Sequence, residues 1–173
     1  MPTVMNPRHV IHHATVERIA PQKICISFGV VLILIGLLGV LTPGLLGMHL
    51  SMAHNMIHIT SGAFALYCGY SNSNKAIAFC LWFGAIYGFL GIAGFVIGEP
   101  GYPGVGNMEA DQNLFRVIPN VLEFGTMDHI IHLLIGAFLL FTAFTFRKDR
   151  KNRNSRLNNL NLRTTLGSSD FEK

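Results

Sequence analysis

Charge is what this sequence has least of. Asp, Glu, Lys and Arg make up 13% of its 173 residues, whereas soluble domains carry about 25%. From Cys25 to Gly98 the only charged residue is Lys75. Half of the residues are apolar, and the mean hydropathy is +0.43. So little charge excludes a typical water-facing surface, and so much apolar composition excludes disorder for the bulk of the chain. We therefore expect an integral membrane protein.

Sequence signatures of several enzyme classes are also missing. There is no phosphate-binding loop, no nucleophile elbow, no dinucleotide fingerprint and no His-Glu-x-x-His zinc motif. A secretory signal is not indicated either, because the first apolar run, Ile24 to Leu41, exceeds the roughly 7–15 residues of a signal core. We interpret that run as a retained membrane span.

Four segments are long enough to cross the hydrocarbon core of a bilayer, which takes about 20 helical residues. The sequence thus predicts an all-α fold, a bundle of four transmembrane helices within residues 24–146. The polar N-terminal residues 1–23, an outer loop at 99–127 and a basic, disordered tail at 147–173 complete the chain. Within the loop, Leu114–Pro119 fits either a short amphipathic helix or a plain structured connection. The predicted spans are 24–42, 50–70, 75–98 and 128–146.

Basic residues predict the orientation of the spans. Twelve of the thirteen Lys and Arg lie in the N-terminal segment, in the Ser71–Lys75 turn or in the C-terminal tail, and only Arg116 lies on the other side. Positive charge marks the cytoplasmic side. We expect a multi-pass protein of the inner (plasma) membrane with both termini in the cytoplasm. The lipid bilayer is its expected partner, and the basic tail does not indicate nucleic acid, because it directly follows an apolar helix.

Two stretches of the sequence align without a gap. His54–Leu66 and Asp128–Leu140 share Ile, His, Gly-Ala-Phe and Leu at matching positions. Gly36–Gly39 resembles Gly91–Gly94 more weakly. The chain is therefore interpreted as two tandem two-helix hairpins that form an internal repeat.

The repeated pattern (His/Asp)-x-x-x-His-x-x-x-Gly-Ala has a parallel in a known family. Together with Pro119-Asn120-Val121-Leu122, which leads into Asp128-His129, it resembles a bacterial family of small four-span membrane proteins that is catalogued only as a domain of unknown function. The resemblance covers residues 24–146. It implies a four-helix membrane fold and no activity.

Glycines form a stripe on the third predicted span. At about 100° per residue, five of them fall within an arc of roughly 120°. Small residues on one face let helices approach closely. The stripe therefore predicts helix packing within the chain or, alternatively, an interface with a second copy or another membrane protein. The packing glycines are Gly84, Gly88, Gly91, Gly94 and Gly98, with Gly36 and Gly39 in the first span.

Four polar residues form the candidate site. His54 and His58 lie on one helix face, and Asp128 and His132 have the same spacing in the repeat. Polar groups at membrane depth are costly and indicate a function. Neutral imidazole with carboxylate is the ligand set of a transition metal, and two histidines four residues apart form a common ligand pair. Structural alternatives are an N-cap role for Asp128 and a hydrogen bond between His58 and His132 across the bundle.

These observations lead to one main expectation and two alternatives. The main expectation is a non-enzymatic integral membrane protein whose biochemical role the sequence does not specify. One alternative is a metal- or haem-binding membrane redox protein that uses His54, His58, Asp128 and His132. The other is a small transporter or proton pathway.

Overall fold

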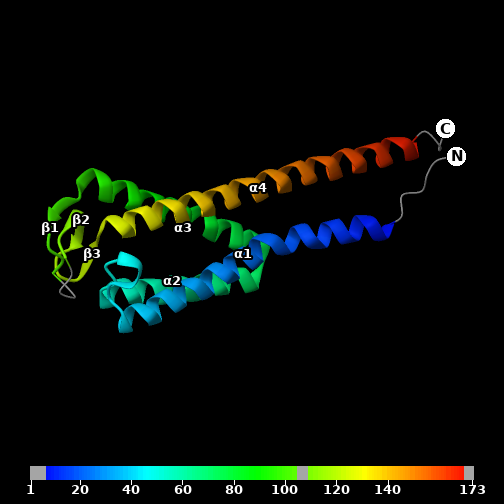
Figure 1. Ribbon diagram of the computed structural model, residues 1–173. Helices are drawn as coiled ribbons and strands as arrows, with labels where there is room; N and C mark the ends of the chain where they lie inside the picture. Colours follow the sequence, from blue (N-terminus) through cyan, green and yellow to red (C-terminus); the bar gives the residue numbers. More distant parts are fainter. Residues whose placement is uncertain (1–6, 105–108, 170–173) are drawn as a thin grey trace.

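The chain is mostly helical. The computed structural model describes the backbone of residues 7–104 and 109–169, and the side chains of residues 20–104, 109–152 and 154–160. Within these residues four α-helices and three short strands follow one another (Figure 1). In order, they are α1 (Pro7–Leu41), a 3-10 turn η1 (Leu45–Gly47), α2 (Met52–Ser71), α3 (Ser73–Ile97), β1 (Glu99–Gly101), β2 (Asp111–Ile118), β3 (Leu122–Phe124) and α4 (Thr126–Ser169).

Three helices of the described chain are long and apolar enough to cross a membrane, at Ala20–Leu41, Ser73–Ile97 and Thr126–Leu160. The large outward-facing side chains along their apolar stretches include Leu37 and Phe141, as a lipid-facing surface requires. Helix α2 falls short by hydropathy, because its first half carries the polar residues of the candidate site.

The helix boundaries follow from local capping. Ser51 accepts a hydrogen bond from the backbone N–H of His54 at 3.2 Å and so begins α2. Asn72 does the same for α3 through the N–H of Lys75 at 3.0 Å. Short polar side chains at these positions satisfy the N–H groups that a helix start leaves unpaired.

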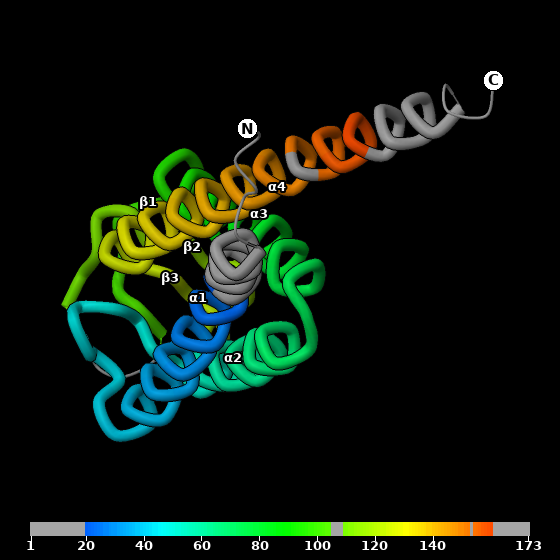
Figure 2. The backbone as a smooth tube through the Cα atoms, turned by 90° about the vertical axis from the view of Figure 1, so that its right-hand side faces the viewer, coloured from blue at the N-terminus to red at the C-terminus, as the bar shows by residue number. Residues whose placement is uncertain are grey.

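The helices pack as two neighbouring pairs. Helix α1 lies along α2, and α3 lies along α4; the view along the long axis shows the two pairs side by side (Figure 2). We call the end that carries η1 and the strands the sheet end. The opposite end, where α2 turns into α3, is the turn end. Helices α1 and α4 extend beyond the turn end (Figure 1).

The glycines explain how closely the paired helices approach. A Cβ at Gly36 would lie 2.7 Å from Ile59 and 2.8 Å from the backbone oxygen of Asn55. A Cβ at Gly91 would lie 2.7 Å from Leu133 and 2.8 Å from the backbone oxygen of His129. Neither position has room for any side chain.

These contacts correspond across the two pairs of helices. The sequence alignment matches Asn55 with His129 and Ile59 with Leu133, and the matched residues meet the matched glycines. Gly39 likewise faces the side chain of Asn55, and Gly94 faces the ring of His129.

Two glycines of the predicted stripe behave differently. Gly84 packs against the backbone of Leu140 on α4, as Gly91 does against Leu133. Gly88 contributes only its backbone: a Cβ at Gly136 of α4 would lie 2.5 Å from the nitrogen of Gly88, whereas a Cβ at Gly88 itself would meet no atom of the described chain within 4 Å. Gly88 lies at one edge of the arc, so its missing side chain points out of the helix contact. Gly98 faces the backbone of Asn113 in β2 instead of another helix.

The apolar core lies towards the turn end. All three cysteines are free and buried there, and the Sγ of Cys25 donates to the backbone oxygen of Ala65 at 3.2 Å. They serve as small apolar core residues. The core comprises Cys25, Ala65, Cys68, Ala76, Phe79, Cys80, Leu139 and Ala143.

The expected outer loop at 99–127 contains an antiparallel sheet in the order β1-β2-β3. The fold is therefore not purely α-helical, and the amphipathic helix considered for Leu114–Pro119 is wrong. Most of that segment lies in β2, where Leu114 is buried and Arg116 exposed. Asn120 has a φ of 62° and turns β2 into β3. Buried Glu123 closes the turn by accepting from the N–H of Asn120 at 3.0 Å.

The ends of the long helices also differ from expectation. Helix α1 begins at Pro7 within the predicted polar segment 1–23, and α4 continues to Ser169 through the tail predicted to be disordered. Residues 147–160 contain neither Pro nor Gly. Extending a helix that already exists needs no new nucleus, so the polar tail continues the helix of the preceding span.

We predict that Gly91→Ala destabilises the protein and that Gly88→Ala does not. A methyl group at residue 91 would overlap Leu133 and the backbone of α4, which costs about 1–3 kcal/mol. The same group at residue 88 enters open space and gains helix propensity of up to about 1 kcal/mol. Thermal unfolding of the purified protein in detergent measures both. Equal melting temperatures for the two variants would contradict the observed packing.

Candidate metal centre

Three histidine rings meet inside the sheet end. His54 and His58 come from successive turns of α2, and His132 comes from the second turn of α4. Their relative exposures are only 2%, 4% and 4%. The ring centroids of His54 lie 4.4 Å from His58 and 5.9 Å from His132. One nitrogen from each ring lies within 4.8 Å of the others. The structure therefore brings together three of the four predicted site residues.

The rings line a cavity of about 130 Å³ between α2, α3, α4 and the sheet. Apart from the histidines and Tyr87, its walls are apolar, and they include Phe83, Leu90 and Phe124. The ring of Phe124 meets His54 and His132 edge-on, at centroid distances of 4.9 and 5.3 Å. The short sheet thus forms one wall of the cavity and separates the histidines from the sheet-end surface.

Hydrogen bonding determines the tautomer of His54. Its Nδ1 lies 3.0 Å from the backbone oxygen of His49. A carbonyl oxygen can only accept, so Nδ1 carries the proton and Nε2 of the neutral ring keeps its lone pair. Metal-binding histidines are typically held in this way, with the second ring nitrogen donating to a carbonyl or a carboxylate.

His58 and His132 each have an unsatisfied nitrogen. The Nδ1 atoms of both rings are buried and have no hydrogen-bond partner among the described residues. The hydrogen bond considered between these two rings is not among the described contacts. An unpaired buried polar group costs about 1–3 kcal/mol. A ligand in the cavity would remove that cost.

Asp128 does not lie in the group of ring nitrogens. Its fully buried carboxylate stands behind His54, with Oδ1 3.9 Å from the Nδ1 of His54. Its Oδ2 accepts from the backbone N–H groups of His49 at 2.9 Å and Gly125 at 2.8 Å, and lies 3.3 Å from the Nδ1 of His49. The expectation that Asp128 joins the three histidines is therefore corrected. Asp128 instead accepts from the backbone of His49, and the backbone oxygen of His49 accepts from His54.

The N-cap alternative for Asp128 is also corrected. The backbone oxygen of Gly125 receives the first helical bond of α4, from His129 at 3.1 Å. Gly125 is thus the N-cap. Asp128 is the third helical residue, and its side chain reaches back to the N–H of the cap residue, as in a capping box.

Residues that the sequence analysis did not select complete the site. His129 donates from Nε2 to the backbone oxygen of Asn113 at 2.7 Å, which attaches β2 to α4. Asp111 accepts from the hydroxyl of Thr126 at 2.6 Å and from its N–H at 2.9 Å. Burial would raise the pKa of the Asp111 carboxyl, but these bonds and one from the N–H of Asn113 outweigh it and lower the pKa below its usual value. Asp111 is therefore ionised at neutral pH and keeps the sheet in place over the cavity.

His129 lies within the aligned repeat, whereas the only sequence signal for Asp111, Asn113 and Thr126 was the polar content of the loop. Asp111, Asn113 and Phe124 lie outside the aligned repeat, so neither the spacing of the histidines nor the periodicity of the spans selects them.

Comparisons with protein families, with curated proteins and with solved structures find no significant match for this chain. The resemblance to the four-span bacterial family therefore stays an expectation, and the argument for function depends on the geometry of the site.

We predict that Asp128→Ala strongly destabilises the protein. The substitution leaves the buried N–H groups of His49 and Gly125 without their acceptor, at about 1–3 kcal/mol for each. Asp149→Ala is the matched control, because Asp149 is exposed on the same helix, and it should change the stability by less than about 0.5 kcal/mol. Thermal melts in detergent compare the two. A small effect of Asp128→Ala would show that the carboxylate does not hold the sheet end together.

Proposed function

We propose that the protein is an integral membrane protein that binds one transition-metal ion through ring nitrogens of His54, His58 and His132. The observation that carries the proposal is the convergence of three buried imidazoles on one small cavity. Two of these rings keep an unpaired nitrogen, and the third is held with its Nε2 free.

The geometry suits a tetrahedral site with one open position. Zinc and histidine nitrogen lie about 2.0–2.1 Å apart, so two ligands of a tetrahedral ion are about 3.4 Å apart. The three nitrogens lie within 4.8 Å of one another, and small side-chain rotations close the difference. Three neutral imidazoles suit zinc, copper, iron or nickel. The fourth position would face the apolar cavity, the arrangement of a metal with room for a small ligand.

A single ion fits the site better than haem does. The cavity measures about 130 Å³, well below the roughly 300–1,000 Å³ of pockets that hold organic ligands. A proton pathway through the protein has less support. Beyond His132, Tyr87 and Ser61 the described core continues with apolar side chains such as Ala65 and Leu139.

We further propose that the protein forms a bundle of four spans in the plasma membrane, with both termini in the cytoplasm. Helix α2 is the span that needs an argument. Its polar residues His54, Asn55, His58 and Ser61 are buried. Its exposed side chains are mostly apolar, such as Phe64, and the hydroxyl of exposed Thr60 donates to the backbone oxygen of Met56 within the helix at 2.8 Å. Mean hydropathy understates how well α2 suits lipid, because the polar residues face inward.

An internal repeat gives the metal site its symmetry. Gly36 and Gly91 make corresponding contacts with the helices that face them, and so do Gly39 and Gly94. This correspondence supports a duplicated hairpin. His58 and His132 occupy matching positions in the two hairpins, and the ion would lie between them. His54 matches Asp128, so the repeat supplies a third ring on one side and its supporting carboxylate on the other.

Metal content tests the proposal directly. Protein purified without a histidine tag should carry about one transition-metal ion per chain. His58→Gln and His132→Gln should each lower the bound metal at least about tenfold, because each removes one of three ligands. Elemental analysis after extensive dialysis measures the stoichiometry.

His129→Gln is the control for this experiment. His129 is as deeply buried as the three cavity histidines and is also hydrogen-bonded, but its ring does not line the cavity. It should retain metal while losing some thermal stability. Metal-free wild-type protein that also fails to bind added zinc, copper or iron would reject the metal site, as would equal loss of metal in all three variants.

The topology has its own test. Single cysteines at exposed Leu46 and Ser71 should lie on opposite sides of the membrane if α2 is a span. In intact cells a membrane-impermeant maleimide should label Leu46→Cys. It should label Ser71→Cys and Asn152→Cys only after permeabilisation. The native cysteines are buried, and the unsubstituted protein reports their background. Labelling of Leu46→Cys and Ser71→Cys from the same side would refute a membrane-spanning α2.

A further inference from the structure

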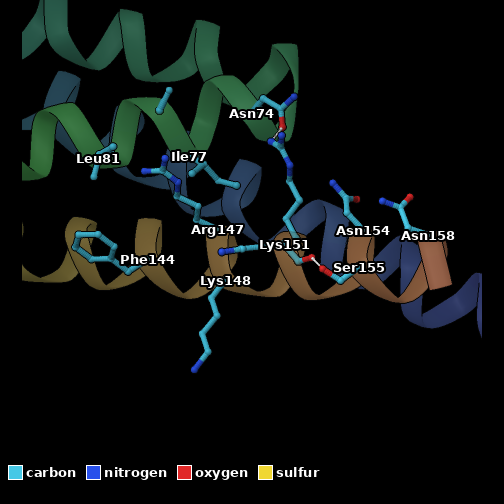
Figure 3. A pocket seen from close by; sticks show the side chains of 12 residues that line it. Asn74, Ile77, Leu81, Phe144, Arg147, Lys148, Lys151, Asn154, Ser155 and Asn158 are labelled. Carbon is cyan, nitrogen blue, oxygen red and sulfur yellow. Dashed lines mark hydrogen bonds between the residues drawn. The ribbon is translucent and has the colours of Figure 1, made fainter.

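A second cavity lies at the turn end, far from the histidines in the chain and in space. It is a groove of about 800 Å³ between the start of α3 and residues 144–158 of α4. In Figure 3, Arg147 reaches from α4 towards Ile77 of α3, whereas Lys148 extends away from the groove. Arg150 bonds to the side chain of Asn74 and so ties α4 to the first turn of α3.

The described residues that line this groove carry positive charge only. None of the described lining residues is acidic, and four are basic: Arg147, Arg150 and Lys151, together with Lys148, whose ammonium group points away. None of these four forms an ion pair among the described side chains; Arg116 pairs with Glu123 at the sheet end. Cations that converge without a carboxylate attract an external anion.

The floor of the groove is apolar. Ile77 and Leu81 on α3 and Phe144 on α4 line it next to the basic residues. The groove therefore has two chemical parts, a cationic rim and a hydrocarbon floor. A free anion such as phosphate would use only the rim.

The position of the groove along the helices matches a membrane interface. Tyr67 and Tyr70 are exposed near the turn, and the Nζ of Lys75 donates to the hydroxyl of Tyr67 at 2.8 Å. Exposed tyrosines and lysines mark the level of lipid headgroups. Asn74 and Ile77 lie within two residues of Lys75, so the rim lies at headgroup depth and the floor at acyl-chain depth.

We propose that this groove binds an anionic phospholipid. The headgroup phosphate contacts Arg147 and Lys151, and one acyl chain lies along Ile77, Leu81 and Phe144. Arginine presents paired donors to phosphate oxygens, and basic pockets between helices on the cytoplasmic side suit anionic headgroups. The site is independent of the metal centre and uses none of its residues.

Native mass spectrometry of the full-length protein in mixed detergent and lipid micelles tests the proposal. The probes are phosphatidylglycerol, which is anionic, and phosphatidylcholine, which has no net charge. The unsubstituted protein should retain phosphatidylglycerol in preference. Arg147→Gln combined with Lys151→Gln should weaken that retention about tenfold, because both phosphate contacts are removed. Excess inorganic phosphate should not displace the lipid, since phosphate cannot use the apolar floor.

Lys148→Gln combined with Arg156→Gln is the matched control. It removes the same charge from the same helix, but Lys148 borders the groove with its ammonium group pointing away from it, and Arg156 does not line it. Retention should stay within about twofold of the unsubstituted protein. Equal losses in the two double variants would overturn the proposal, because they would indicate attraction to net charge alone. Displacement by phosphate would replace the lipid with a free anion as the ligand.

A measurement on the unsubstituted protein covers the case in which the groove variant does not fold. Preference for phosphatidylglycerol should decrease as salt is raised, since exposed charges are screened. A preference that salt leaves unchanged, or no preference at all, would also overturn the proposal. Metal content should be the same in both double variants, which separates this site from the histidine centre.

Discussion

The carboxylate of Asp128 ties the connection between α1 and α2 to the start of α4 at the sheet end. It is fully buried, and so it needs donors on every side. The structure supplies the N–H groups of His49 and Gly125, with the rings of His49 and His54 nearby. These groups belong to the connection between α1 and α2, to the start of α4 and to α2. One carboxylate oxygen thus joins two segments that are distant in sequence, whereas Oδ1 has no hydrogen-bond partner among the described residues. His54 is oriented through the backbone oxygen of His49, which Asp128 helps to hold in place.

The close approach of paired helices puts this carboxylate and the histidines within reach of one another. Gly36 and Gly91 let α2 and α4 pack against the backbones of α1 and α3. Since small residues allow this approach without a hydrophobic driving force, they suit a protein surrounded by lipid. The sheet then covers the rings: Phe124 packs on His54 and His132, and Asp111 ties β2 to the start of α4. The sheet therefore covers the three rings on its own side.

Periodicity and residue spacing predicted the parts of the structure that depend on local sequence. Four helices, the facing of His54 with His58 and the tight contact at Gly91 all follow from 3.6 residues per turn. What depends on distant partners could not be predicted. The strand Asp111–Ile118 pairs with residues on both sides of it, and Asp128 turns towards His49. Gly88 meets α4 with its backbone, while its Cβ direction is open, although it shares the arc of its neighbours. The helical tail after Phe146 depends on propagation from the preceding span, which composition alone does not reveal.

The central claim is that three imidazoles of one chain coordinate one ion. X-ray absorption at the edge of the metal found in untagged protein tests it most directly, because the first coordination shell identifies the ligands. We expect about three nitrogen ligands at roughly 2.0–2.1 Å with the scattering pattern of imidazole, and a fourth light ligand. A sulfur shell near about 2.3 Å would place the ion at the cysteines of the turn end instead. That result, or a shell of oxygen ligands without imidazole, would contradict the account.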